Sequence, residues 1–427
     1  MRYALTNMKI LNGHADMVPV AGQAILVDDG RITAIVAQDA VPPEYPAVDL
    51  GGRYLLPGLI NLHVHIPSSG KPTKKKVNYS KVAALLKFGV VRAVVRAMCA
   101  SNARQQLLSG TTTIRAVGGV LDFDTDLRDK INAGKVTGPR ILAANTAISV
   151  PGGHMTGSVA LPAHSPEQAA QMVRDLDRQK PDLIKLMITG GVLDAEIPGE
   201  PGVLKMPREY VKAAVDEAHR LGSKVAAHVE STEGMQVALE NGVDTLEHGG
   251  KPTEQVLKLF HETGAALIAT LSPAVPFAVM DQAVTGMSDT DLINGKALFT
   301  YMRECIDACL EENIPVGLGT DTGCPYITQY DMWRELWYFS HYCGVTPAYA
   351  IHTATQINAR LVGLDGETGT VDVGKSADFM VVERNPLEDL QALRHPTEVV
   401  FRGKLLHDPK PKKFAAVERE LDKLLTL

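Results

Sequence analysis

The sequence has few cysteines, no excess of positive charge and no long apolar run, and each shortage excludes a class of protein. The five cysteines are odd in number and lack the spacing of a disulfide framework, which favours a reducing compartment. The formal net charge of -6 leaves no basic excess to neutralise phosphates, so nucleic acid is not an expected partner. No stretch approaches about 18 uninterrupted apolar residues, and no signal-like segment opens the chain. We therefore expect a cytoplasmic protein with no membrane partner.

Short strand patterns separated by turns occur at both ends of the chain. Near the start they cover residues 3–11, 24–27, 31–36 and 54–56. Near the other end they cover residues 369–373, 377–382 and 399–406, and apolar residues at helical spacing follow at 414–427. We expect residues 1–56 and 365–427 to form one small β-sandwich domain built from both ends, with a terminal helix.

Apolar strands alternate with helical patterns in the middle of the chain. The eight strand candidates are residues 59–66, 111–117, 140–148, 183–189, 224–229, 245–248, 265–271 and 316–320. This alternation predicts a parallel sheet covered by helices on both faces, and eight units indicate a closed barrel. The expected fold class is therefore α/β, a (β/α)8 TIM-like barrel over residues 57–364, with a mainly helical insertion at 77–108.

Two histidines stand at the end of the first predicted barrel strand. His63 and His65 are two residues apart, and side chains at this spacing on a strand point the same way. Two neutral imidazoles at the mouth of a barrel are typical zinc ligands. Two structural histidines with satisfied hydrogen bonds would give the same pattern, so the pair alone leaves both interpretations open.

Four more residues of ligand type end later strands, at the edge of the barrel where active sites are built. They are Lys185, His228, His248 and Asp321. Lys185 lies within an apolar strand, where burial of an ammonium group is costly. We interpret it as an amine of lowered pKa that adds CO2 to become a carbamate, an anionic ligand able to bridge two metal ions. A lysine that reaches solvent from the strand edge is the alternative.

This combination resembles the amidohydrolase superfamily in its binuclear form with a carboxylated lysine. The resemblance rests on the segments 57–65 (PGLINLHVH) and 369–378 (GTVDVGKSAD). The segments 110–115 (GTTTIR) and 152–154 (GGH) are similar to the branch with prolidase-like, Xaa-Arg/Lys carboxypeptidase-like and imidazolonepropionase-related proteins. The resemblance implies a barrel enzyme that hydrolyses a carbon–nitrogen amide bond of a small molecule.

The resemblance also implies how two divalent ions, expected to be zinc, are bound. One ion takes His63, His65 and Asp321 as ligands. The second takes His228 and His248, and the carboxylated Lys185 bridges both.

The mechanism expected from these ligands is attack by a metal-bridging hydroxide. Asp321 would take the proton of this nucleophile and pass it to the leaving nitrogen. His154, in a glycine-rich loop, would bind the substrate and polarise its carbonyl. A histidine that only caps the loop is the alternative. Tyr326 is a second expected substrate contact. Where peptidase-like relatives place an aromatic residue or a histidine after the fifth-strand ligand, this sequence has Val-Glu-Ser at 229–231.

Three acidic residues follow the fourth predicted strand. Asp194, Glu196 and Glu200 can line the pocket, but an exposed loop is the favoured interpretation.

Several functions remain open. The small-molecule substrate is either an acyclic amide (an N-acyl amino acid, or a dipeptide of Xaa-Pro or Xaa-Arg/Lys type) or a cyclic amide or imide. A catalytically inactive scaffold is disfavoured by the complete ligand set. An aminohydrolase acting on a heterocycle is disfavoured because such enzymes usually use one metal. A homo-oligomer is expected.

Overall fold

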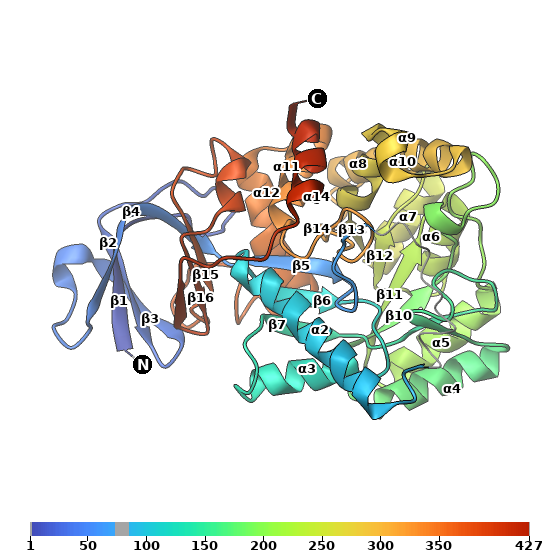
Figure 1. The fold of residues 1–427 in the computed structure, drawn as a ribbon, viewed down its shortest axis with the longest axis horizontal. Coiled ribbons are helices and arrows are strands. Elements are labelled where there is room, and N and C mark those ends of the chain that lie inside the picture. Colours follow the sequence, from blue (N-terminus) through green and yellow to red (C-terminus); the bar gives the residue numbers. More distant parts are fainter. Residues whose placement is uncertain (1, 73–84, 427) are drawn as a thin grey trace. The chain divides into compact units, whose positions relative to one another are not determined.

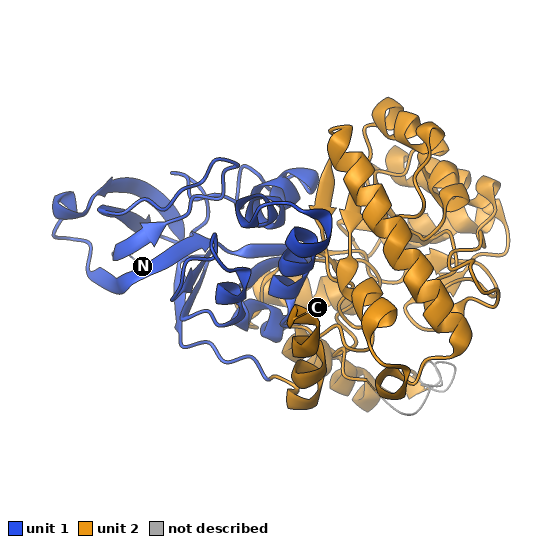
Figure 2. Ribbon diagram, turned by 90° about the horizontal axis from the view of Figure 1, so that it is seen from above, with its two compact units in different colours: residues 1–61, 103–114, 330–412 blue, residues 62–102, 115–329, 413–427 orange. Residues whose placement is uncertain are grey.

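The computed structural model describes residues 2–72 and 85–426. The chain divides into two compact units (Figure 2). The first consists of residues 1–61, 103–114 and 330–412, and the second of residues 62–102, 115–329 and 413–427. The domain boundaries expected at 56/57 and 364/365 follow the change in sequence pattern and stay a prediction.

Strands from both ends of the chain form one mixed sheet in the first unit (Figure 1). In spatial order they are β17 (Lys404–His407), β16 (Glu398–Phe401), β15 (Phe379–Val382), β4 (Ala47–Pro57), β1 (Arg2–Ile10), β2 (Gln23–Asp28) and β3 (Arg31–Ala37). β4 is parallel to β1 and antiparallel to β15, which joins the strands of the two ends. Buried side chains from both ends, among them Leu5, Ile25 and Phe379, share one apolar core. The prediction that the two ends build one β domain is confirmed.

The middle of the chain supplies the parallel strands of the barrel. They are β5 (Leu59–Val64), β6 (Thr111–Ala116), β7 (Arg140–Ala143), β8 (Ala147–Ser149), β10 (Leu183–Met187), β11 (Lys224–Val229), β12 (Thr245–His248), β13 (Ala266–Ala269) and β14 (Val316–Leu318). β5, β6 and β7 are neighbours, and β8 to β14 continue in parallel order, with the short β9 (Ala160–Pro162) beside β8. A parallel bridge between Val64 and Thr322 brings the end of β5 to the segment after β14. The predicted barrel is therefore confirmed.

Helices follow most barrel strands, and side-chain caps define where several of them begin. They are α2 (Gly89–Leu108), α3 (Phe123–Asn132), α4 (Pro166–Asp177), α5 (Arg208–Arg220), α6 (Thr232–Glu240), α7 (Glu254–Thr263), α8 (Leu271–Val279), α9 (Gln282–Thr285), α10 (Asp289–Glu311), α11 (Met332–Cys343), α12 (Pro347–His352), α13 (Asn358–Leu361) and α14 (Ala415–Asp422). Ser165, Ser231 and Thr253 each accept a backbone N–H of the first turn of α4, α6 and α7. Within residues 2–72 and 85–426, no helix has the length and apolarity needed to cross a membrane.

Two predicted strands differ from the structure because the backbone turns within them. Residues 140–148 form two strands, β7 and β8, and Asn145 between them adopts a left-handed φ of 60°. Residues 399–406 form the hairpin of β16 and β17, because Arg402 and Gly403 both have positive φ (48° and 71°). Positive φ at both central residues is the requirement of a type I′ turn, which matches the twist of the paired strands.

Two other predicted segments are changed or only partly described. Residues 369–373 have a bent, irregular backbone instead of a strand. The Val371 N–H is donated to the Asn12 carbonyl and the Thr370 hydroxyl to Asp372. Local side-chain bonds of this kind compete with a sheet ladder. The predicted insertion at 77–108 begins outside the described residues, and its described part contains the helix α2.

Candidate metal centre

The two histidines at the end of β5 each have one ring nitrogen fixed by the protein. Nδ1 of His63 lies 2.7 Å from a carboxylate oxygen of Glu247, and Nδ1 of His65 lies 2.9 Å from the Gly118 carbonyl oxygen. Partners of this kind set the tautomer and ring orientation of metal-binding histidines. Burial and the nearby Lys185 charge lower the pKa of His63 well below its usual value. Both histidines therefore present Nε2 as the available ligand atom.

His228 at the end of β11 and His248 at the end of β12 are held in the same way. Nε2 of His228 donates to the Gly190 carbonyl at 3.0 Å, and Nδ1 of His248 lies 2.7 Å from the Thr270 hydroxyl. The ring centroid of His248 lies 4.8 Å from that of His228 and 4.7 Å from that of His63. Burial lowers the pKa of both rings well below the usual value, which favours the neutral form that binds a metal.

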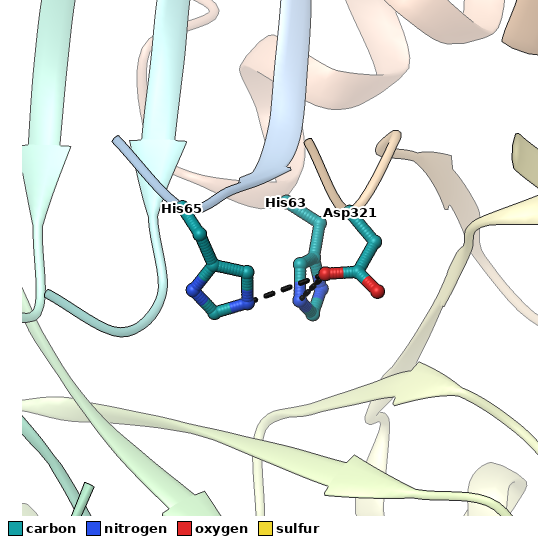
Figure 3. Close-up of side chains that lie close together, drawn as sticks. All are labelled: His63, His65 and Asp321. Atoms are coloured by element: carbon teal, nitrogen blue, oxygen red, sulfur yellow. Dashed lines mark ion pairs between the residues drawn. The ribbon is translucent and has the colours of Figure 1, made fainter. Parts of the chain in front are cut away.

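Asp321 faces the β5 histidines from the segment after β14 (Figure 3). Its Oδ1 lies 3.5 Å from Nε2 of His63 and 3.3 Å from Nε2 of His65. Burial alone would raise the pKa of Asp321, but its interactions with His65, His63 and the Cys324 thiol lower it to about 2. The ligand atoms of these three residues lie within 4.8 Å of one another, so the trio can hold one divalent ion.

A second group of converging ligand atoms contains a residue that the sequence analysis did not propose as a ligand. His228, Glu230 and His248 offer atoms within 4.8 Å of one another. Oε1 of Glu230 lies 4.0 Å from Nε2 of His228, the nitrogen that already donates to Gly190. Glu230 and His228 are two residues apart, a spacing that places side chains on the same side of an extended segment, and this was the signal available in the sequence.

Lys185 on β10 is buried beside both groups. Its Nζ has no hydrogen-bond partner among the described residues, and its side chain lines the same cavity as His63, His228 and Asp321. Burial lowers the pKa of Lys185 to about 8. Burial of a cationic amine without a partner costs free energy. A group that binds or modifies this amine would therefore stabilise the site. The imidazoles, the carboxylate and this amine form a donor set that fits a binuclear centre.

A buried ion pair between Arg115 and Glu247 stabilises the orientation of the His63 ring. Nη2 of Arg115, on β6, lies 2.8 Å from both carboxylate oxygens of Glu247, and Nε of Arg115 donates to the Leu62 carbonyl at 2.7 Å. Thr245 donates its hydroxyl to Glu247 as well. The arrangement holds the Glu247 carboxylate against Nδ1 of His63. Neither charged residue was predicted as part of the site, although a charge within each of two predicted barrel strands was a visible signal.

Two of the metal-site candidates have unusual backbone conformations. His248 has φ of 71° and Asp321 has φ of 54°, in the left-handed region that residues other than glycine seldom adopt. Such conformations cost roughly 1–3 kcal/mol each and gather at functional sites, where the surrounding structure maintains them.

A cavity of 380 Å³ opens over the candidate ligands. The side chains of His63, His65, Lys185, His228, His248 and Asp321 all line it, and His154 joins them. Its apolar wall includes Val95, Met98, Val120, Met155, Val159 and Met187. The structure thus brings together every predicted metal ligand and one of the two predicted substrate contacts.

The remaining predicted pocket residues have other environments. The Tyr326 hydroxyl donates to the Val284 carbonyl at 2.7 Å, and the residue is not among the described residues that line the cavity. Glu196 is exposed, as expected for a surface loop, and the exposed Glu200 lines a separate hollow. Asp194 is exposed as well, but its carboxylate also lies 2.8 Å from Nδ1 of His154.

Comparison with known proteins agrees with this geometry over nearly the whole chain. The model of the amidohydrolase family matches residues 54–406, and that of the NagA composite domain matches residues 2–55. A crystal structure from Bifidobacterium longum, provisionally named a prolidase, is 36% identical with a TM-score of 0.87 and covers 99% of both chains. A Xaa-Pro dipeptidase with methionine bound in its active site is 26% identical, with a TM-score of 0.82, over 95% of this chain and 100% of that one. Ochratoxinase of Aspergillus niger is 26% identical over 425 residues, 92% of this chain and 85% of that protein. The chain belongs to the amidohydrolase family, whose members are hydrolases that act on carbon–nitrogen bonds.

Proposed function

We propose that the protein is a binuclear metal-dependent amidohydrolase that cleaves an acyclic amide of a small molecule, either an N-acyl amino acid or a dipeptide. The observation that carries this proposal is the buried Lys185 amine, which lacks a partner among the described residues at the cavity that four histidines and Asp321 share. Addition of CO2 to the neutral amine, with release of one proton, makes a carbamate. Its two oxygens can bridge two ions, which removes the cost of an unpaired buried cation.

The two groups of ligand atoms support a division of the ligands between two ions. His63, His65 and Asp321 would hold one ion, and His228 and His248 the other, with the Lys185 carbamate shared. Imidazole nitrogen and carboxylate oxygen are ligands that zinc prefers, so zinc is the proposed metal.

The residues of the chain divide the work of hydrolysis. When bound, two divalent ions supply Lewis acidity and lower the pKa of water. Asp321 accepts the proton of the attacking water and delivers it to the leaving nitrogen, as base and then acid. His154 lines the cavity, where it can donate a hydrogen bond to the carbonyl oxygen of the amide as negative charge develops there.

The wall of the cavity supports a substrate with an apolar portion. Val95, Met98, Val120 and Met155 lie along it, and apolar lining of this kind favours an aliphatic or aromatic group. The similarity to a Xaa-Pro dipeptidase supports an acyclic, peptide-like amide.

A substrate panel on the metal-loaded protein tests the proposal. We expect turnover of N-acetyl-leucine, N-acetyl-phenylalanine or apolar dipeptides, and none after the ions are removed with a chelator. Each acyclic amide is paired with a cyclic amide or imide of similar size. Turnover confined to the cyclic compounds, or no hydrolysis of any amide with both ions bound, would contradict the proposal.

A further inference from the structure

Contacts on both faces of its ring fix the position of His154 beside the candidate metal centre. Its ring lies flat against that of His228, with centroids 4.1 Å apart and planes only 6° from parallel. On the other side, the backbone of Gly191 closes on the ring, because a Cβ atom there would lie 2.8 Å from Cε1 and 3.1 Å from Nδ1 of His154. The imidazole therefore fits between a histidine ring and a position where only glycine leaves room.

Asp194 holds the outer nitrogen of this ring. It ends the short 3-10 turn Val192–Asp194, forty residues after His154 in the sequence, and its Oδ2 lies 2.8 Å from Nδ1 of His154. Its other oxygen accepts the Gly191 N–H at 2.6 Å. Each carboxylate oxygen thus has one partner, so the turn that carries Gly191 also orients the carboxylate.

We propose that Asp194 is a positioning residue for His154, seating its ring so that Nε2 and not Nδ1 faces the cavity. With Nδ1 occupied by the carboxylate, Nε2 is the nitrogen left for a substrate oxygen. Stacking on His228 fixes the plane of the His154 ring. The contact with Asp194 fixes which edge of that ring points outward. The proposal rests on the proposed function only for the identity of the atom that Nε2 meets.

Activity measurements test whether Asp194 acts through His154. In Asp194→Ala we expect kcat to fall about 10²-fold, the loss that a small misplacement of a reacting contact can cause, with metal content unchanged. Asp194→Asn keeps an acceptor for Nδ1 and should recover part of kcat. Leu193→Ala, an exposed neighbour in the same turn, is the matched control and should keep wild-type kcat.

A double-mutant cycle separates this role from a general effect on the loop. If Asp194 acts through His154, Asp194→Ala lowers kcat no further in a protein that already carries His154→Ala. The same fold loss in both backgrounds, or full activity in Asp194→Ala, would overturn the proposal. Should Asp194→Ala fail to fold, the same cycle with Asp194→Asn decides.

A crystal structure of Asp194→Ala gives a test that needs no substrate. The His154 ring should turn or leave its stacked position on His228, while His228 itself stays in place. An unchanged ring would refute the positioning role even if the amidohydrolase activity is established. A displaced ring supports the role even if every amide tried is inert.

Discussion

The two carboxylate oxygens of Asp321 face different partners. Oδ1 approaches Nε2 of His63 and of His65, whereas Oδ2 accepts a hydrogen bond from the Cys324 thiol at 3.3 Å. One oxygen is thus directed to the proposed metal and the other to Cys324, which also lines the cavity. This division suits a residue that both binds an ion and carries a proton.

Asp321→Asn should abolish most turnover without loss of the fold. An amide has the same shape but cannot accept the proton, and general acid–base groups contribute about 10²–10⁴-fold to the rate. The loss in kcat should be at least of that order, while the ion of His228 and His248 stays bound. His228→Ala is the comparison variant. It removes a proposed metal ligand, so we expect its metal content to fall and the loss of turnover to follow from that. If Asp321→Asn keeps more than about a tenth of the wild-type kcat with both ions bound, it is not the proton carrier.

Lys185→Ala should lose both metal and activity, and small carboxylic acids such as acetate should restore part of each. The added acid replaces the two oxygens of the proposed carbamate in the space left by the side chain. Lys224→Ala, which removes an exposed lysine, should behave as wild type in the presence or absence of acetate. Labelled bicarbonate provides a direct measurement, because metal-loaded wild type should show a carbamate carbon. Absence of that signal would show that Lys185 is unmodified.

The sequence predicted the candidate ligands and missed the residues that hold them, for a physical reason. The candidate ligands lie in barrel strands or in the segments that follow them, and parallel strands bring their ends to one edge of the barrel. They are His63, His65, Lys185, His228, His248 and Asp321. Glu247 and Thr270 hold His63 and His248 through hydrogen bonds to residues far away in the sequence. A charge within a strand can be noticed in the sequence, but no local pattern shows which distant residue it contacts.

At the scale of elements, local periodicity predicted the strands, whereas single backbone turns were less visible. The alternation of apolar strands and helices was sufficient for β10, β11 and β12, whose predicted and observed ranges nearly coincide. It was insufficient where one residue with positive φ divides a run, as Asn145 divides β7 from β8. Such a residue ends a strand although apolar residues lie on both sides of it.

Gly319→Ala tests how closely β14 and β5 must approach. A Cβ atom at Gly319 would lie 2.5 Å from Cβ and 2.6 Å from the backbone N of His63. Overpacking of this kind costs about 1–3 kcal/mol, and it should displace His63 and lower metal affinity. Denaturant unfolding and metal analysis measure the two effects. Gly366→Ala, at an exposed position with nothing within 4 Å of the new atom, is the control. Equal stability and equal metal content in both variants would contradict the close-packing account.

At the scale of the whole molecule, the middle of the chain forms the barrel and its two ends together form one sheet. The sheet pairing of β4 with β15 links residues separated by more than three hundred positions, which the sequence pattern suggested only through the similar composition of the two ends. Cytoplasmic location, a small-molecule partner and a homo-oligomeric state remain predictions. The binuclear site is the feature on which the functional account depends.

Elemental analysis of the metal-loaded protein tests that feature most directly. Five of the six candidate ligands fall into two groups of converging ligand atoms, and the sixth, Lys185, lines the same cavity, so we predict two divalent ions per chain. His63→Ala should lose one ion and retain the one held by His228 and His248, which makes the count specific to the site. A reproducible two ions per chain in the wild type is the predicted result, and one ion or fewer would contradict the account.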